Sequence, residues 1–149
     1  MINFTYEGEA VGKGRPRVSR AGGYVHTYTP AKTRQFEEEI RLAFKEQVKE
    51  STPVYPRDNT LCAFVGIGVS VPKSYSKKRR EDCLNGREAP TKKPDIDNIL
   101  KAIFDALNGY AYEDDAQIVS IQAHKSYKEE PSIYINIWEI SEGRTCELD

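Results

Sequence analysis

The amino-acid sequence predicts a small α+β domain, with a mixed or antiparallel sheet of about four to five strands and two main helices. Three features of the chain favour this class. Residues 2–7 and 132–140 alternate apolar and polar side chains, as strands with one buried face do. Residues 31–50 repeat apolar side chains at helical spacing. Residues 61–71 are rich in apolar and β-branched residues, which is typical of a central strand.

The first half of the chain carries several local turn and cap signals. The glycine pair Gly22-Gly23 predicts a tight hairpin turn, and residues 24–28 follow it as a short strand. The pair Thr29-Pro30 predicts a helix start, with a hydroxyl N-cap and proline at the first helical position. We therefore expect an amphipathic helix from Ala31 to about Glu50.

The next segments differ sharply in their apolar content. Residues 73–93 are polar and basic without a sustained apolar period, so we expect a mobile loop. A short helix around residues 76–84 is the alternative. Residues 97–108 carry apolar side chains on one face and are followed by Gly109, which is typical of a helix end. These residues are the predicted second main helix.

The last part of the chain completes the sheet. Residues 118–125 and 132–140 alternate well and are joined by a short polar link, so we expect an antiparallel hairpin. The chain then divides into one domain at residues 1–140 and a short C-terminal tail at residues 141–149.

Composition limits the classes of function. About 38% apolar and 30% charged residues in a chain of 149 are ordinary for a soluble globular protein. No apolar run approaches the roughly 20 residues of a membrane span, so we expect no membrane partner. The N-terminus lacks the basic start and apolar stretch of a signal peptide, so we expect a cytoplasmic location. Two isolated histidines and three widely spaced cysteines disfavour a zinc cluster and favour a metal with oxygen ligands.

Charge is segregated along the chain, although its net value is only −1. Residues 12–20 contain four basic residues and no acid, and residues 73–93 contain eight basic residues against three acidic ones. Because local charge decides phosphate binding more than the sum does, these two segments are candidates for contact with nucleic acid.

The most informative stretch is residues 93–109, K-P-D-I-D-N-I-L-K-A-I-F-D-A-L-N-G, followed at residues 114–119 by D-D-A-Q-I-V. Asp95 and Asp97 lie where an extended segment enters a helix, and Lys101 lies one turn beyond Asp97 on the same face. Carboxylates held close together repel one another, and a divalent cation such as magnesium or manganese removes that conflict. Such an ion also activates water against a phosphodiester.

Each part of this pattern has a simpler explanation. Asp97 alone could be a helix N-cap, and Asp97 with Lys101 could form an ordinary surface salt bridge. Asp114 and Asp115 could be turn residues before a strand. The specificity therefore lies in the combination of the parts.

The combined motif resembles the signature of the RusA family of Holliday junction resolvases, tightly over residues 93–119 and more loosely elsewhere. The resemblance implies three catalytic, metal-binding carboxylates and one catalytic lysine: Asp95, Asp97, Asp115 and Lys101. It implies that Asp114 is an auxiliary metal-binding acid and that Asn98 supports the site. Asp105 also matches, with a helix-stabilising or supporting role as open as a chemical one.

The resemblance implies a metal-dependent endodeoxyribonuclease that uses Mg²⁺ or Mn²⁺ and resolves Holliday junctions by paired symmetric nicks during DNA recombination and repair. Two symmetric nicks in a four-way junction also imply a homodimer. Two alternatives stay open: a broader nuclease for flaps and branched DNA, and a non-catalytic module that binds nucleic acid.

The basic segments would draw phosphates towards the acidic site. The side chains expected to contact DNA are Lys13, Arg15, Arg17, Lys73, Lys77, Lys78, Arg79, Arg80, Lys92 and Lys93. Tyr24, Tyr28 and Tyr75 could stack on unpaired bases near a branch point or serve as packing residues.

Overall fold

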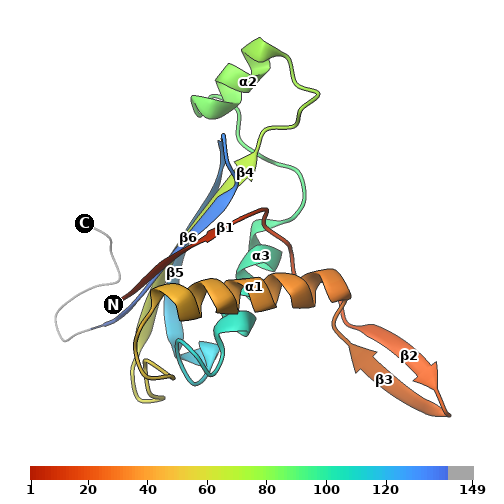
Figure 1. Cartoon of the computed structure of the whole chain (residues 1–149), viewed down its shortest axis with the longest axis vertical. Coiled ribbons are helices and arrows are strands. Elements are labelled where there is room, and N and C mark those ends of the chain that lie inside the picture. The colour runs from red at the N-terminus through yellow and green to blue at the C-terminus, as the bar shows by residue number, and fades with distance from the viewer. Residues whose placement is uncertain (141–149) are drawn as a thin grey trace.

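The computed structural model describes residues 1–140, and the tail predicted at residues 141–149 lies outside these described residues. Within the described range the chain forms six strands, three α-helices and one 3-10 helix (Figure 1). In chain order these are β1 (Ile2–Glu7), β2 (Arg17–Ala21), β3 (Tyr24–Tyr28), α1 (Ala31–Gln47), β4 (Leu61–Ser70), α2 (Lys77–Leu84), α3 (Ile96–Leu107), η1 (Asp115–Gln117), β5 (Ile118–Lys128) and β6 (Ser132–Glu139). The predicted α+β class is confirmed.

The main sheet has four strands in the order β1-β6-β4-β5. β6 runs antiparallel to both β1 and β4, whereas β5 runs parallel to β4, so the sheet is mixed. β4 lies between β6 and β5, which confirms the expectation of a central strand at residues 61–71. The strands β2 and β3 form a separate two-stranded sheet.

The predicted antiparallel hairpin of residues 118–125 with residues 132–140 is wrong. β4 separates the two strands: Gly68 pairs with Ser126 on one side and with Ser132 on the other. A Cβ atom at Gly68 would lie 2.7 Å from Lys128 Cδ and 3.2 Å from the Ser132 carbonyl oxygen. Because glycine has no side chain, Lys128 at the end of β5 and Ser132 at the start of β6 can both lie close to β4 at this position. Alternation of apolar and polar residues shows which face of a strand is buried, but it does not show which strand pairs with it.

Both main helices lie on the same side of the sheet (Figure 1). α3 starts and ends within one residue of its predicted bounds, and α1 ends at Gln47, before the predicted Glu50. At the start of α1 the N-cap position belongs to Pro30, with no side-chain cap hydrogen bond, so the expected hydroxyl cap from Thr29 is not formed. The helices bury apolar side chains against the sheet, including Phe36, Ile40, Phe44, Ile99, Ile103, Leu107, Ile133, Ile135 and Ile137.

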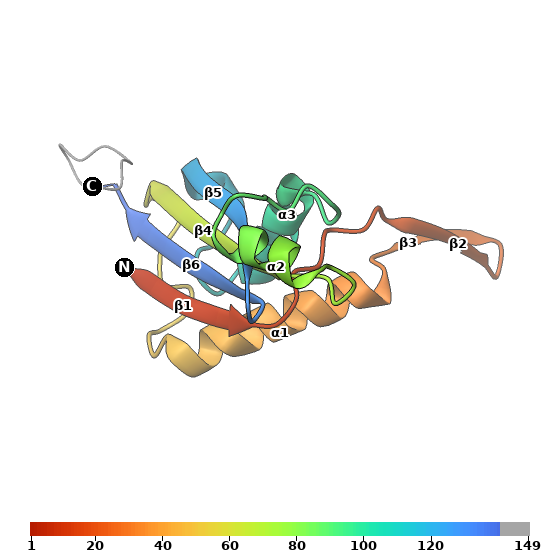
Figure 2. The ribbon, with the colours of Figure 1, turned by 90° about the horizontal axis from the view of Figure 1, so that it is seen from above.

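Two elements extend beyond this layered body. The β2–β3 hairpin projects from the N-terminal end of α1, and α2 lies beyond one end of the sheet (Figures 1 and 2). The segment expected to be a loop contains the helix α2, so the alternative of a short helix near residues 76–84 is correct. The Ser76 side chain caps this helix by accepting a hydrogen bond from the Arg79 backbone N–H. In residues 1–140, no helix combines the length and the apolar character needed to cross a membrane.

Candidate active site

The helix α3 carries most of the candidate residues, and its first turn holds two of them. Asp95 occupies the N-cap position, with an extended backbone, and its side chain makes no cap hydrogen bond. Its carboxylate is half exposed and lies 3.5 Å from Lys93 Nζ. Asp97 lies in the first helical turn and is exposed. Asp97 is therefore not the N-cap, so the explanation of Asp97 as a helix cap does not hold.

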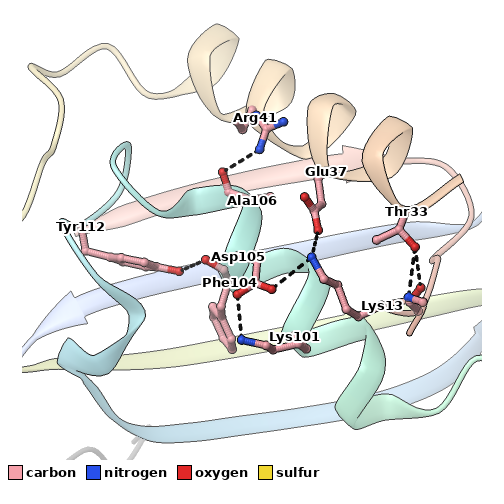
Figure 3. A network of polar contacts seen from close by, with 11 residues as sticks. Lys13, Thr33, Glu37, Arg41, Lys101, Phe104, Asp105, Ala106 and Tyr112 are labelled. Carbon is pink, nitrogen blue, oxygen red and sulfur yellow. Dashed lines mark hydrogen bonds and ion pairs between the residues drawn. The ribbon is translucent and has the colours of Figure 1, made fainter. Parts of the chain in front are cut away.

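A network of charges crosses from α3 to α1 (Figure 3). Lys101 Nζ donates to Asp105 Oδ1 at 2.9 Å, and the Lys101 side chain is 60% exposed whereas that of Asp105 is 20% exposed. The second oxygen of Asp105 lies 3.2 Å from Lys13 Nζ, which also donates to Glu37 Oε1 at 2.6 Å. Asp105 therefore joins the candidate catalytic lysine to the basic N-terminal segment.

The turn that carries Asp114 and Asp115 is fixed to the end of α3. The Asn108 side-chain oxygen accepts a hydrogen bond from the Asp115 backbone N–H at 2.9 Å. Asp114 caps η1 by accepting from the Ala116 N–H at 3.2 Å, and the Gln117 side chain accepts from the Asp114 N–H in return. The link between helix and strand thus folds back towards the helix.

The charges around this turn perturb one another. Partial burial raises the pKa of Asp115, and its hydrogen bond with Asp114 and the negative charge of Asp105 act in the same direction. The Ala116 N–H lowers the pKa of Asp114, and so does the hydrogen bond with Asp115. The hydrogen bond to Asp105 raises the pKa of Lys101, and the charge of Asp115 adds to this effect. Lys101, Asp105 and Asp115 are therefore electrostatic neighbours.

The predicted metal ligands fall into two groups. Asp114 and Asp115 lie together near Lys101, whereas Asp95 and Asp97 lie at the start of α3. Among residues 1–140, no three acidic, histidine or cysteine side chains are placed so that they could already hold a metal ion. Asp97 and Lys101 share one helix face because they are four residues apart, which places the exposed Asp97 side chain on the Lys101 side.

The donor chemistry fits a hard divalent cation. All four predicted ligands are carboxylates, the groups that magnesium and manganese prefer. The raised pKa of Asp115 reflects burial next to other negative charge, a conflict that a cation would relieve.

The basic segment before β2 packs directly on the candidate helix. Lys13 N–H donates to the Asn98 carbonyl at 2.8 Å, and Gly14 N–H donates to Thr33 Oγ1 at 3.1 Å. A Cβ atom on Gly12 would lie 3.2 Å from Asn98 Cβ, so glycine permits this close approach. Asn98 thus binds the basic segment through its backbone carbonyl.

A groove of about 680 Å³ opens beside this contact. Its charged lining residues are five cations and one acid: Lys13, Arg15, Arg17, Lys32, Lys93 and Asp95. A cationic groove that reaches a candidate catalytic carboxylate is suited to a phosphate backbone.

The cationic side chains expected at DNA divide by their surroundings. Lys13 and Arg79 are already engaged: Lys13 lies between two carboxylates, and Arg79 binds Glu88 at 2.7 Å and stacks over Tyr75 at 3.6 Å. Lys92 also lies over the Tyr75 ring, at 5.4 Å from its centroid. Tyr75 is thus a packing residue for α2. The other expected residues are exposed: Arg15, Arg17, Lys73, Lys77, Lys78, Arg80 and Lys93.

Sequence reasoning missed one residue that shapes the site and left another undecided. Lys125 on β5 donates to the carbonyl oxygens of Lys92 at 3.0 Å and Pro94 at 2.9 Å, so it holds the loop that leads into Asp95. No local motif marks this lysine, because its partners lie about 30 residues earlier in the chain. Asp105 was left undecided, and the structure places it between Lys13 and Lys101.

Comparison with known proteins yields two matches that cover nearly the whole chain. Residues 7–138 match the model of the family described as "Endodeoxyribonuclease RusA". The chain is also 39% identical over 140 residues to a Bacillus subtilis (strain 168) protein named "Uncharacterized protein YqaN". That match spans 94% of this chain and 97% of the relative.

Proposed function

The chain belongs to the RusA endodeoxyribonuclease family, and from that premise we propose that it resolves Holliday junctions by paired symmetric nicks that depend on Mg²⁺ or Mn²⁺. The observation that carries the proposal is the placement of Lys101 beside Asp105 and Asp115, on a helix whose start borders a cationic groove. The activity would serve DNA recombination and repair.

In this proposal the carboxylates of Asp95, Asp97 and Asp115 hold the metal ion, with Asp114 as an auxiliary ligand. When bound, a divalent cation supplies stabilisation of negative charge and lowers the pKa of a bound water. The hydrogen bond from the Asp115 backbone N–H to Asn108 supports this scheme, because it folds η1 back towards α3. The metal ion would then draw Asp115 together with Asp95 and Asp97 from the start of the helix.

Lys101 acts on the phosphate itself. Its side chain is an ammonium at neutral pH, and the hydrogen bond to Asp105 favours that charged form further by raising its pKa. The side chain is also exposed enough to meet a substrate. A fixed positive charge beside the scissile phosphate stabilises the negative charge that grows on the oxygens during cleavage. Asp105 is a positioning residue, since it holds Lys101 and contacts no substrate in this scheme.

The groove supplies the attraction that the acidic site lacks. Arg15, Arg17 and Lys32 line it, and their charges would track the phosphate backbone without reading sequence. A homodimer would present two such sites to the two opposed strands of a four-way junction.

The test is a cleavage assay with the full chain on a fixed four-way junction, with Mg²⁺ added or chelated and each strand labelled in turn. We expect metal-dependent nicks at symmetric positions in two opposed strands, with a linear duplex of equal length spared. Flaps cut as fast as junctions would instead indicate a broader structure-selective nuclease. Junction binding without metal-dependent cutting would indicate a binding module.

A further inference from the structure

The β2–β3 hairpin projects into solvent and carries exposed aromatic side chains. It extends away from the sheet at the start of α1 (Figure 2), and all five residues of β3 are exposed. Tyr24 is 73% exposed and Tyr28 is 46% exposed. An isolated two-stranded hairpin is marginally stable in water, and exposed aromatic side chains on one mark a contact surface.

The strand register sorts the side chains of the hairpin onto two faces. Arg17 lies opposite Tyr28 and Ser19 opposite His26, so Tyr24, His26 and Tyr28 share one face with Arg17. The opposite face carries Val18, Arg20, Val25 and Thr27. One face therefore presents a row of aromatic rings, and the other presents two valines with an arginine and a threonine.

Charge identifies the class of partner. From Ala10 to Phe36 the chain contains six cationic residues and no carboxylate; the six are Lys13, Arg15, Arg17, Arg20, Lys32 and Arg34. Arg17 also lines the groove that leads to Asp95, so the aromatic face and the groove form one continuous surface. A polyanion fits this surface better than a protein of mixed charge does.

Ring spacing points to bases. Alternate residues of a strand are about 6.6–6.8 Å apart, which is twice the roughly 3.4 Å spacing of stacked bases. Rings that follow this backbone spacing would leave room for one base between neighbours in the row Tyr24, His26, Tyr28. Bases are free to stack in this way only where the duplex is interrupted.

We propose that the aromatic face of the β2–β3 hairpin binds unpaired or unstacked bases at a DNA branch point and so distinguishes branched DNA from linear duplex. This inference deepens the proposed function, since it names how the same groove selects its substrate.

The test compares two matched double variants that both keep a β-branched residue in the hairpin. Tyr24→Thr with Tyr28→Thr removes the two tyrosine rings of the aromatic face, and Val18→Thr with Val25→Thr changes the opposite face. Binding of a fixed four-way junction and of a linear duplex is measured in EDTA, where no cleavage occurs. We expect the tyrosine variant to lose about tenfold or more in junction affinity, with duplex affinity within about twofold. The valine variant and Tyr24→Phe with Tyr28→Phe should keep the junction preference.

A second measurement uses the unmodified protein and does not depend on the folding of any variant. A 2-aminopurine base at the branch point should change its fluorescence when the protein binds, because its stacking partner changes.

An unchanged signal, an unchanged ratio of junction to duplex affinity, or an equal loss in the valine variant would overturn the proposal. A change in sedimentation of either variant without DNA would also overturn it, because the hairpin would then be an interface between copies. If the unmodified protein cuts no DNA but the tyrosine variant loses junction preference, the nuclease proposal fails and this one stands.

Discussion

Lys13 Nζ lies 3.2 Å from Asp105 Oδ2 and so ties the basic N-terminal segment to the helix that carries Lys101. Glu37 on α1 holds the same ammonium at 2.6 Å. Burial alone would lower the pKa of Lys13, but the bonds to Glu37 and Asp105 raise it overall. Lys13 is thus a permanent cation inside the fold, with its charge committed to two carboxylates.

Replacing Lys13 should therefore reduce stability. In Lys13→Met, Glu37 and Asp105 would face each other without the cation between them, and we expect a loss of about 1–3 kcal/mol in the free energy of unfolding by urea denaturation. Lys32→Met is the matched control, because Lys32 is exposed and lies near Lys13 in the same groove lining. It should change stability by less than about 0.5 kcal/mol. Equal effects of the two variants would contradict the structural role.

Substitutions of the candidate catalytic residues should reduce DNA cleavage without reducing DNA binding. We expect Asp95→Asn, Asp97→Asn, Asp115→Asn and Lys101→Ala each to reduce nicking of a fixed junction by about a hundredfold or more, as loss of charge stabilisation does. Junction affinity should change little, and the carboxylate variants should bind as tightly or more tightly because repulsion of phosphate is eased. Asp105→Asn should slow nicking less than Lys101→Ala, since it only releases the lysine. A parallel loss of binding and cutting would count against these roles.

Local patterns in the sequence predicted individual elements well. The bounds of α3 follow from the spacing of Ile103 and Leu107 and from Gly109, whose φ of 82° ends the helix. The β2–β3 turn follows from Gly22 and Gly23, whose φ angles are both positive. In each case the signal and its structural consequence lie within a few residues.

Long-range relationships were not predictable in the same way. The charge of Lys13 indicated phosphate contact, but its partners Glu37 and Asp105 are 24 and 92 residues away, and only the packing of α1 on α3 brings them together. The order of the strands likewise depends on the insertion of β4 between β5 and β6, which alternation cannot report. The motif thus indicated where the candidate site lies. The packing of α1 on α3 determined that the charge of Lys13 is paired with carboxylates within the protein.

Ionisation of Tyr6 should weaken the contact between β1 and α1 at high pH. Burial raises the pKa of its hydroxyl to about 12, and the hydrogen bond to Glu39 at 2.8 Å acts in the same direction. Because the folded state favours the protonated form, this contribution is complete below about pH 10, the ordinary pKa of tyrosine, and is lost as the pH rises through 12. The free energy of unfolding should therefore fall more steeply between these values than in Tyr6→Phe. Identical pH profiles would refute this assignment.

Two glycines of β4 should respond differently to alanine. At Gly68 a Cβ atom would meet Lys128 Cδ at 2.7 Å and the Ser132 carbonyl oxygen at 3.2 Å, whereas at Gly66 the nearest atom lies at 3.5 Å. The lysine can move, but the backbone oxygen is fixed by strand pairing. We expect Gly68→Ala to cost about 1–2 kcal/mol more in thermal or urea unfolding than Gly66→Ala. Equal losses of stability in the two variants would mean that the close packing of Lys128 and Ser132 on β4 does not require glycine at position 68.

Lys125 should act on the rate of cutting through the loop that leads into Asp95. Its ammonium binds the carbonyl oxygens of Lys92 and Pro94, and Lys125→Met would release both, so Asp95 would lose its fixed entry into α3. We expect single-turnover nicking at saturating enzyme to slow by about tenfold while junction affinity changes little, because small displacements of a catalytic group are costly. Lys125→Arg should restore part of the rate, and Lys128→Met, an exposed lysine at the end of the same strand, should not slow nicking. If Lys125→Met lowers the melting temperature but leaves the nicking rate unchanged, Lys125 has a structural role only.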